Sequence, residues 1–282
     1  MHILTFDIEE WFHLLDNPST KTNSQWGNYE VRIHQNMERV FNILDATNTK
    51  ASFFVLGWIA EKYPEVVREI CDRGYEIGSH TTSHQLVYEQ SKQAFQADVE
   101  RSIKSLEDIS GKKVKMFRAP GFSIKEKNKW AFEILFELGI EIDSSVFPAE
   151  RAHGGLPSYG SAKPSILQYN GTQLKEFPIN TFPILFKPMI FSGGGYFRFF
   201  PYKCIKEWTQ KSDYVMSYFH PRDFDPEQPI VKGLSPQRKF KTYVGLKRTE
   251  EKLKNWTSDF EFIDIEMANN QIDWKTVRKI QL

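Results

Sequence analysis

The sequence predicts an α/β fold in which parallel strands alternate with helices. Short apolar runs recur through residues 3–142, and stretches with apolar residues at helical spacing separate them. Each strand-and-helix unit covers about thirty residues, which is enough for a crossover between parallel strands. These observations predict a parallel sheet, either open or closed into a barrel.

The elements of the first half follow from local residue patterns. Pro64 suits the first turn of a helix, and Gly74 is placed to end that helix in the left-handed conformation. Gly111 and Gly139 follow two later helical patterns. We expect strands at 3–6, 51–56, 75–78, 114–117 and 140–142. We expect helices around 37–44, 64–71, 95–106 and 131–138.

In the second half the pattern is interrupted and then resumes. Residues 147–200 contain many Pro and Gly residues and no long periodic helix, so we expect irregular, β-rich insertions over one face of the scaffold. Beyond them we expect helices at 202–211 and 247–256 and strands at 214–219 and 260–265. No Ser/Gly linker or low-complexity block marks a boundary, so we expect one domain over residues 1–282.

Composition narrows the classes of function. The chain has 37 basic and 36 acidic side chains, so it lacks the broad basic surface that binds nucleic acids or anionic bilayers. No apolar run is long enough for a membrane span, and no secretory signal precedes the first strand. We therefore expect a cytoplasmic protein without stable membrane insertion. Aromatic residues make up 15% of the chain, a weak indication of stacking on sugars.

Polar residues follow the predicted carboxyl ends of five strands. In parallel α/β folds this edge of the sheet carries the active site, so we expect these residues to meet. They are Asp7, Glu9 and Glu10 after the first strand, His80 and His84 after the third, Arg118 after the fourth, Asp143 to Ser145 after the fifth, and His220 after the strand at 214–219.

His80 and His84 have the chemistry of metal ligands. On a helical turn, residues four apart share a face, so both imidazoles could hold one divalent ion, although such pairs are also common as packing or capping residues. In an extended segment Asp7 and Glu9 share a face. One carboxylate could bind the metal while the other accepts a proton from water. Glu10 points away from this face unless a turn brings it round.

Two further residues complete this scheme. Arg118 could keep a catalytic carboxylate ionised, or it could be a surface arginine before the Pro-Gly turn that follows it. His220 could act as a general acid, because the pKa of a histidine lies near neutral pH. Its alternative is an ordinary strand-end histidine before a proline.

The order of these residues resembles the polysaccharide deacetylases, metal-dependent carbohydrate esterases that hydrolyse N- or O-acetyl groups on sugars. The matching motifs are Thr5-Phe6-Asp7, His80-x-x-x-His84, Arg118-Ala-Pro-Gly, Asp143-Ser-Ser and Tyr218-Phe-His220-Pro. Longer motifs resemble the branch found in exopolysaccharide gene clusters. These are Phe6-Asp-Ile-Glu-Glu-Trp-Phe-His13, Glu176-Phe-Pro, Gly193-Gly-Gly-Tyr-Phe-Arg198, Asp223-Phe-Asp-Pro-Glu-Gln-Pro229 and Tyr243-Val-Gly-Leu-Lys-Arg248.

The resemblance implies a distorted (β/α) barrel with fewer than eight parallel strands. It also implies Asp7 as the catalytic base, His80 and His84 as metal ligands, Arg118 as the residue that orients the base, and His220 as the catalytic acid. Many members have a second aspartate as a metal ligand where this chain has Ile8, so we assign that role to Glu9, with Glu10 as the alternative. Asp143 resembles an aspartate after a late barrel strand, and we assign it as a partner of His220.

The implied reaction is metal-dependent hydrolysis of an acetyl group, which we assign as N-acetyl, with Zn²⁺ as the expected ion. Expected substrates are an N-acetylated sugar, a nucleotide-sugar or a lipid-linked saccharide of polysaccharide biosynthesis. We expect a backbone N–H near Ser144 or Ser145 to contact the oxyanion, Tyr196 to stack on the sugar, and Arg198 to contact a hydroxyl or phosphate, unless the glycine run before Tyr196 is only a hairpin. Further candidates for the cleft are Trp11, Phe12, His153 and Phe197.

Two other functions stay open at this point. One is a metal-independent amidohydrolase similar to allantoinase, which would act on a small cyclic amide. The other is a non-catalytic carbohydrate-binding scaffold that uses the same aromatic cleft. Activity that survives a chelator would favour the first, and sugar binding without metal or acetate release would favour the second.

Overall fold

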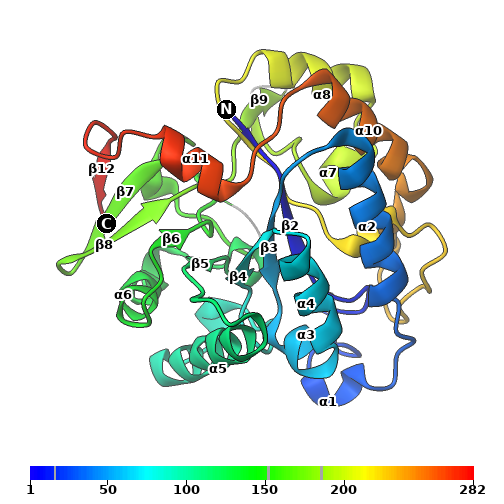
Figure 1. Cartoon of the computed structure of the whole chain (residues 1–282), viewed down its shortest axis with the longest axis horizontal. Helices are drawn as coiled ribbons and strands as arrows, with labels where there is room; N and C mark the ends of the chain where they lie inside the picture. The colour runs from blue at the N-terminus through cyan, green and yellow to red at the C-terminus, as the bar shows by residue number, and fades with distance from the viewer. Residues whose placement is uncertain (16, 151–152, 185–186) are drawn as a thin grey trace.

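The parallel sheet runs from the first half of the chain into the second. The computed structural model describes residues 1–15, 17–150, 153–184 and 187–282 (Figure 1). Strands pair in parallel in the order in which they occur along the chain, which confirms the predicted α/β fold. They are β2 (Thr5–Ile8), β3 (Ser52–Val55), β4 (Glu76–Ser79), β5 (Met116–Phe117), β6 (Ile142–Asp143) and β8 (Thr172–Glu176).

The sheet curls until its first strands meet the late part of the chain. The strand β1 (His2–Ile3) pairs in parallel with β11 (Val215–Met216), and Phe6 of β2 forms a bridge to Phe219. This arrangement is the distorted barrel that the family resemblance implies. The assignment of the whole chain to one domain stays a prediction.

The second half adds the expected β-rich insertions. The strand β7 (Ser165–Tyr169) lies antiparallel to β8, and β12 (Lys279–Gln281) pairs with the outer side of β7. The strands β9 (Phe182–Ile184) and β10 (Lys187–Met189) form a separate antiparallel pair. These additions lie away from the parallel strands that carry the site.

Helices cover the outside of the parallel strands (Figure 1). In the first half they are α1 (Asn23–Trp26), α2 (Ile33–Thr47), α3 (Gly57–Lys62), α4 (Pro64–Asp72), α5 (Lys92–Ser110) and α6 (Trp130–Glu137). In the second half they are α7 (Gly194–Phe199), α8 (Tyr202–Gln210), α9 (Pro236–Tyr243), α10 (Thr249–Asp259) and α11 (Ile265–Gln271). Among the described residues, no helix combines the length and the apolar character that a membrane crossing requires.

One predicted strand of the second half is wrong. Residues 260–265 form a single bridge, between Ile263 and Ile3, and α11 starts where the strand was expected to end. The side chain of Asp264 accepts a hydrogen bond of 2.7 Å from a backbone N–H in the first turn of α11. This cap favours a helix over continuation of the apolar run as a strand.

The glycine run at residues 193–195 starts a helix and does not form a hairpin. The helix α7 begins at Gly194 and packs beside the end of the strand region at Tyr218. A Cβ atom at Gly193 would lie 2.1 Å from the carbonyl oxygen of Tyr218, so a glycine is required there. The glycine therefore allows α7 to approach the strand end that carries His220.

Candidate active site

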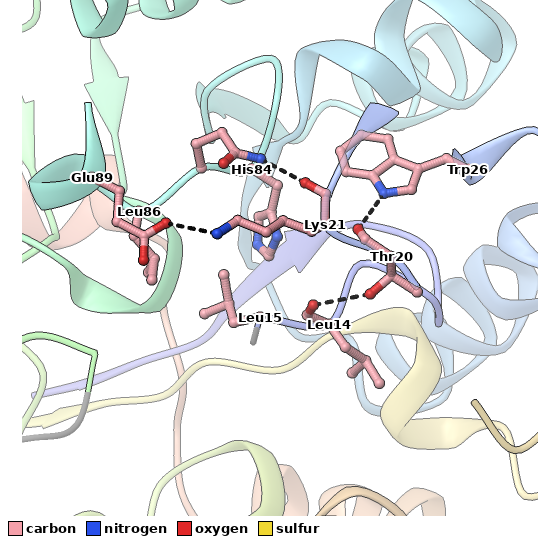
Figure 2. A pocket seen from close by; sticks show the side chains of 9 residues that line it. Leu14, Leu15, Thr20, Lys21, Trp26, His84, Leu86 and Glu89 are labelled. Atoms are coloured by element: carbon pink, nitrogen blue, oxygen red, sulfur yellow. Dashed lines mark hydrogen bonds and ion pairs between the residues drawn. The ribbon is translucent and has the colours of Figure 1, made fainter. Parts of the chain in front are cut away.

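Five of the polar residues predicted at the strand ends line one cleft of about 780 Å³. Asp7 and Glu9 reach it from the end of β2, His80 and His84 follow β4, and His220 follows β11. A smaller cavity of about 50 Å³ also contacts His84, as Figure 2 shows. The larger cleft has room for a saccharide, whereas the smaller cavity holds little more than water.

The side chains of Glu9, His80 and His84 form a buried group that could hold a metal ion. One ligand atom from each lies within 4.8 Å of the other two. The Oε2 atom of Glu9 lies 2.8 Å from Nε2 of His84, yet this buried oxygen has no hydrogen-bond partner of normal geometry. A carboxylate oxygen and two imidazole nitrogens that face one point are a donor set suited to Zn²⁺ or a similar ion.

The charge of Glu9 is also favoured by its neighbours. Burial would raise the pKa of this carboxyl group, but the nearby imidazoles of His84 and His220 outweigh it and lower the pKa well below the usual range. An ionised Glu9 is the form that binds a cation. The residues present therefore fit a divalent ion.

Glu10 has a different task, which decides between the two candidate carboxylates. Its Oε1 accepts hydrogen bonds from the backbone N–H groups of Arg32, at 2.7 Å, and Ile33, at 2.9 Å, at the start of α2. Its Oε2 accepts one from Trp11 at 3.2 Å. Burial raises the pKa of Glu10 to about 7 despite these hydrogen bonds. Glu10 thus caps a helix, and Glu9 is the carboxylate that faces the two histidines.

The two histidines meet without the helical turn that their spacing predicted. Residues 80–84 form an irregular loop, in which Thr81 and His84 have positive φ angles of 65° and 54°. The Nδ1–H of His80 donates a hydrogen bond of 2.8 Å to the carbonyl oxygen of Arg118, which leaves Nε2 for a ligand role. Burial lowers the pKa of His80 to about 4, so at neutral pH this imidazole is uncharged.

Arg118 holds Asp7 in place beside this group. Its Nη1 donates to Oδ1 of Asp7 at 2.7 Å and to the hydroxyl of Thr5 at 2.6 Å. The guanidinium also lies over the ring of Phe54, 4.1 Å from its centroid. Arg118 is fully buried, so the reading of a surface arginine is wrong.

Ser144 supports Arg118 and does not face the cleft. Its hydroxyl accepts a hydrogen bond of 2.9 Å from Nη2 of Arg118 and donates one of 2.8 Å to the carbonyl oxygen of Phe177. Its backbone N–H already donates to Phe117, and that of Ser145 donates to Asp143. The predicted contact of Ser144 with the oxyanion therefore does not match the structure, because both N–H groups are already used.

His220 lies against the metal-binding group and is oriented by an aspartate that the sequence reasoning missed. Its Nε2 is 3.2 Å from Oε1 of Glu9 and 4.0 Å from Oδ2 of Asp7. Its Nδ1 is 3.2 Å from Oδ2 of Asp223, which also accepts the backbone N–H of His220 at 2.9 Å. Burial would lower the pKa of His220, but the charge of Glu9 and the contact with Asp223 raise it to about 9.

Asp143 lies elsewhere, so the structure puts Asp223 in the place that we had assigned to it. The carboxylate of Asp143 is fully buried and accepts the hydroxyl of Ser145 at 2.6 Å. Its neighbour is Glu176, whose pKa is raised well above the usual range by burial and by the charge of Asp143. The signal for Asp223 was its position three residues after His220, which lets one carboxylate cap the turn and contact the ring.

Arg198 lines the cleft, as the expected contact with substrate requires, but its guanidinium is used in contacts within the protein. Its guanidinium donates to the carbonyl oxygens of Thr242, at 2.7 Å, and Lys241, at 3.2 Å, and its Nε lies 3.2 Å from Oδ1 of Asp223. Arg198 thus fixes Asp223 and joins α7 to α9. Burial would raise the pKa of Asp223, but the charge of Arg198 helps to lower it to about 2.

The aromatic walls of the cleft are partly those predicted. Tyr196 lines the cleft and is 38% exposed, and His153 lines it as well. Trp11, Phe12 and Phe197 are buried in ring clusters of the core, so their assignment as walls is wrong. Two exposed rings that we had not singled out, Phe199 and Phe240, line the cleft instead.

Comparison with known proteins divides the chain into two matched regions. Residues 3–141 match the model of the polysaccharide deacetylase family, and residues 144–269 match a domain of unknown function, DUF3473. A peptidoglycan-N-acetylglucosamine deacetylase from Bacillus cereus is 32% identical over 96 residues, which are 34% of this chain and 35% of that protein. Chitin deacetylase 1 from Saccharomyces cerevisiae is 33% identical over 78 residues, 28% of this chain and 26% of that protein. The matches thus span about a third or less of each relative.

Solved structures share the fold over nearly the whole chain. A protein from Mycobacterium smegmatis, described as belonging with the polysaccharide deacetylases, superimposes with a TM-score of 0.66 at 16% identity and covers 99% of this chain and 92% of its own. A CE4 family pseudoenzyme from Bacillus anthracis has a TM-score of 0.51 at 11% identity and covers 100% of this chain and 69% of its own. At these identities the likeness shows the fold alone. The family assignment rests on the two matched regions: residues 3–141 match the polysaccharide deacetylase family, and residues 144–269 match DUF3473.

Proposed function

We propose that the protein hydrolyses an N-acetyl group on a carbohydrate and uses a divalent ion, Zn²⁺ in our assignment, held by Glu9, His80 and His84. The observation that carries this proposal is the meeting of three parts at one cleft. The group of possible ligands, the carboxylate of Asp7 and the imidazole of His220 all lie there, with 4.0 Å between the last two.

Each residue has a role in this scheme. A divalent ion bound there would polarise the acetyl carbonyl and lower the pKa of a water molecule toward about 7. Asp7 accepts the proton of the attacking water through Oδ2, because Arg118 holds its Oδ1 at 2.7 Å. His220 then protonates the departing nitrogen, which makes the amine a better leaving group.

Two residues position these groups. Arg118 fixes Asp7, and its carbonyl oxygen also orients the ring of His80 through the 2.8 Å hydrogen bond. Asp223 holds Nδ1 of His220, which directs Nε2 toward Asp7 and Glu9. Base and acid therefore approach the acetyl group from separately anchored elements, β2 and the turn after β11.

For the substrate we propose a sugar intermediate of polysaccharide biosynthesis, nucleotide-linked or lipid-linked, in the cytoplasm. Support comes from the motifs that resemble the exopolysaccharide branch and from the exposed rings of Tyr196 and Phe199 beside the cleft. Exposed rings of this kind stack on sugar faces.

The test is acetate release by the Zn²⁺-loaded protein from N-acetylated chitooligosaccharides. We expect release that stops with a chelator and returns with Zn²⁺, and that falls about 10³-fold in Asp7→Asn and in His220→Gln. His34→Asn is the matched control, because His34 is exposed and pairs with Glu65 outside the cleft. Near-normal release by the His220 variant would refute the acid role. Sugar binding without any acetate release would favour the scaffold.

A further inference from the structure

Three arginines are buried in the described part of the chain, and one of them differs from the other two. Arg118 pairs with Asp7 at 2.7 Å, and Arg198 pairs with Asp223 at 3.2 Å. Arg222 is 7% exposed and has no carboxylate within ion-pair distance among the described residues. A buried cation without a counter-charge is destabilising, so its presence requires a reason.

The guanidinium of Arg222 is held from one side only. Its Nε donates to Oε1 of Gln228 at 3.0 Å, and Gln228 is itself anchored to the carbonyl oxygens of Arg222, at 2.7 Å, and Asp225, at 2.8 Å. The buried Nη2 has no hydrogen-bond partner, and within the described ranges Nη1 forms no hydrogen bond either. The ring of Tyr243 lies 5.8 Å away. The side chain is therefore fixed through Nε, while no described group accepts a hydrogen bond from its terminal nitrogens.

Arg222 faces the cleft next to the reacting groups. It lies two residues after His220, in the turn Pro221–Phe224, and lines the cleft that contains Asp7 and Glu9. Two cations of α9, the half-buried Arg238 and the exposed Lys241, line the same cleft, and Glu150 is an exposed acid on its lining. The carboxylate nearest in sequence, Asp223, is already engaged by Arg198 and His220.

We propose that Arg222 binds an oxyanion of the substrate, a phosphate or a carboxylate, beside the sugar that is deacetylated. The inference rests on the proposed function and narrows its substrate to an acidic N-acetylated saccharide. A guanidinium forms charge-assisted hydrogen bonds with such an anion, and the bound anion supplies the missing counter-charge. The anion can belong to a phosphate ester or to a uronic acid, and the experiment separates these sources.

The test compares anion binding by the Zn²⁺-loaded wild-type protein and its variants in isothermal titration calorimetry. The probes are N-acetylglucosamine 1-phosphate, glucuronate and neutral N-acetylglucosamine. In Arg222→Gln we expect the Kd for one anionic probe to rise about 10- to 100-fold relative to the neutral probe, as for a lost charge-assisted pair. A loss with the phosphate indicates a phosphate ester, and a loss with glucuronate indicates a uronic acid.

Two controls keep the result interpretable. Lys241→Gln removes an exposed charge from the same cleft, and we expect a change of less than about threefold, because exposed charges are screened. Arg222→Lys keeps the positive charge but replaces the guanidinium group with an ammonium group. It provides a second variant if the glutamine variant does not fold. Unchanged anion binding in both Arg222 variants, or an equal loss in Lys241→Gln, would overturn the inference. Binding is scored without turnover, so a failure of acetate release alone would count against the proposed function only.

Discussion

The two halves of the chain contribute to the cleft in different ways. Residues 3–141 supply Asp7, Glu9, His80 and His84 from the ends of regular parallel strands, together with Arg118 that orders them. The second half supplies His220 and its partner from a short turn, held by side chains of an irregular region. The regular half thus builds the candidate metal centre, and the irregular half builds the acid and the surroundings of the substrate.

Because the two halves contribute different groups, substitutions in each half should impair different properties of the protein. A change in the first half should alter metal binding or the base. A change in the second half should alter the acid, the substrate range or the local packing while the candidate metal centre stays intact.

The acid and its partner should differ in size of effect. His220→Gln removes the proton donor, and we expect kcat to fall about 10³-fold with Zn²⁺ binding little changed. Asp223→Asn keeps a side chain beside the ring but removes its charge, so we expect a smaller loss, of about 10-fold. Steady-state kinetics with N-acetylated oligosaccharides, beside a Zn²⁺ titration of each variant, measures both. A larger loss for Asp223→Asn than for His220→Gln would contradict this order.

Glu9 and Glu10 form a matched pair within the first half. Glu9→Gln should weaken Zn²⁺ binding about 100-fold, because it removes a charged ligand while leaving both histidines. Glu10→Gln should leave Zn²⁺ binding near that of the wild type and lower the free energy of unfolding by about 1 kcal/mol, because it weakens the cap of α2. Competition with a chromophoric chelator and urea denaturation measure the two effects. If Zn²⁺ binding were weaker in Glu10→Gln and unchanged in Glu9→Gln, Glu10 would be the metal ligand instead of Glu9.

Neighbouring rings of α7 should separate packing from substrate contact. Phe197 is fully buried against Phe219 and Trp256, so Phe197→Ala should lower the free energy of unfolding by about 3–5 kcal/mol. Phe199 is 55% exposed on the cleft, so Phe199→Ala should change stability by less than about 1 kcal/mol and raise KM a few-fold. A normal KM in the folded Phe199 variant would show that this ring is not part of the sugar site.

The buried carboxyl groups of Asp143 and Glu176 should make the stability of the fold depend on pH. Burial and the charge of Asp143 raise the pKa of Glu176, so the folded state holds a proton that the unfolded state has released above its own pKa. Stability contributed by this proton is therefore lost as the pH rises above about 4.5, the region of an ordinary glutamate. Glu176→Gln should flatten the decline in Tm between pH 5 and 8, and an unchanged slope would contradict the assignment.

Sequence reasoning worked where one backbone rule decides the position of a side chain. The alternation along β2 correctly sent Ile8 to the core and Asp7 and Glu9 to the cleft. It was less successful where side chains far apart in sequence compete for one partner. The guanidinium of Arg198 donates hydrogen bonds to carbonyl oxygens of α9. No local sequence pattern indicates these contacts.

The same limit explains the other differences. Trp11 follows the first motif directly, but its burial depends on the ring of Tyr29, 5.5 Å away in a different segment. The approach of His80 and His84 depends on left-handed residues in their loop, which nothing in a histidine pair predicts. The role of Asp223 could have been predicted from the sequence, since a carboxylate three residues after His220 can cap the turn that begins there.

The central claim is that Glu9, His80 and His84 hold a divalent ion between Asp7 and His220. Anomalous diffraction at the zinc absorption edge, on crystals grown with Zn²⁺, tests it most directly. We expect a peak about 2.0–2.2 Å from a carboxylate oxygen of Glu9, Nε2 of His80 and Nε2 of His84. A peak bound by Glu10, or a zinc position that excludes either histidine, would show that these three residues do not form the metal site.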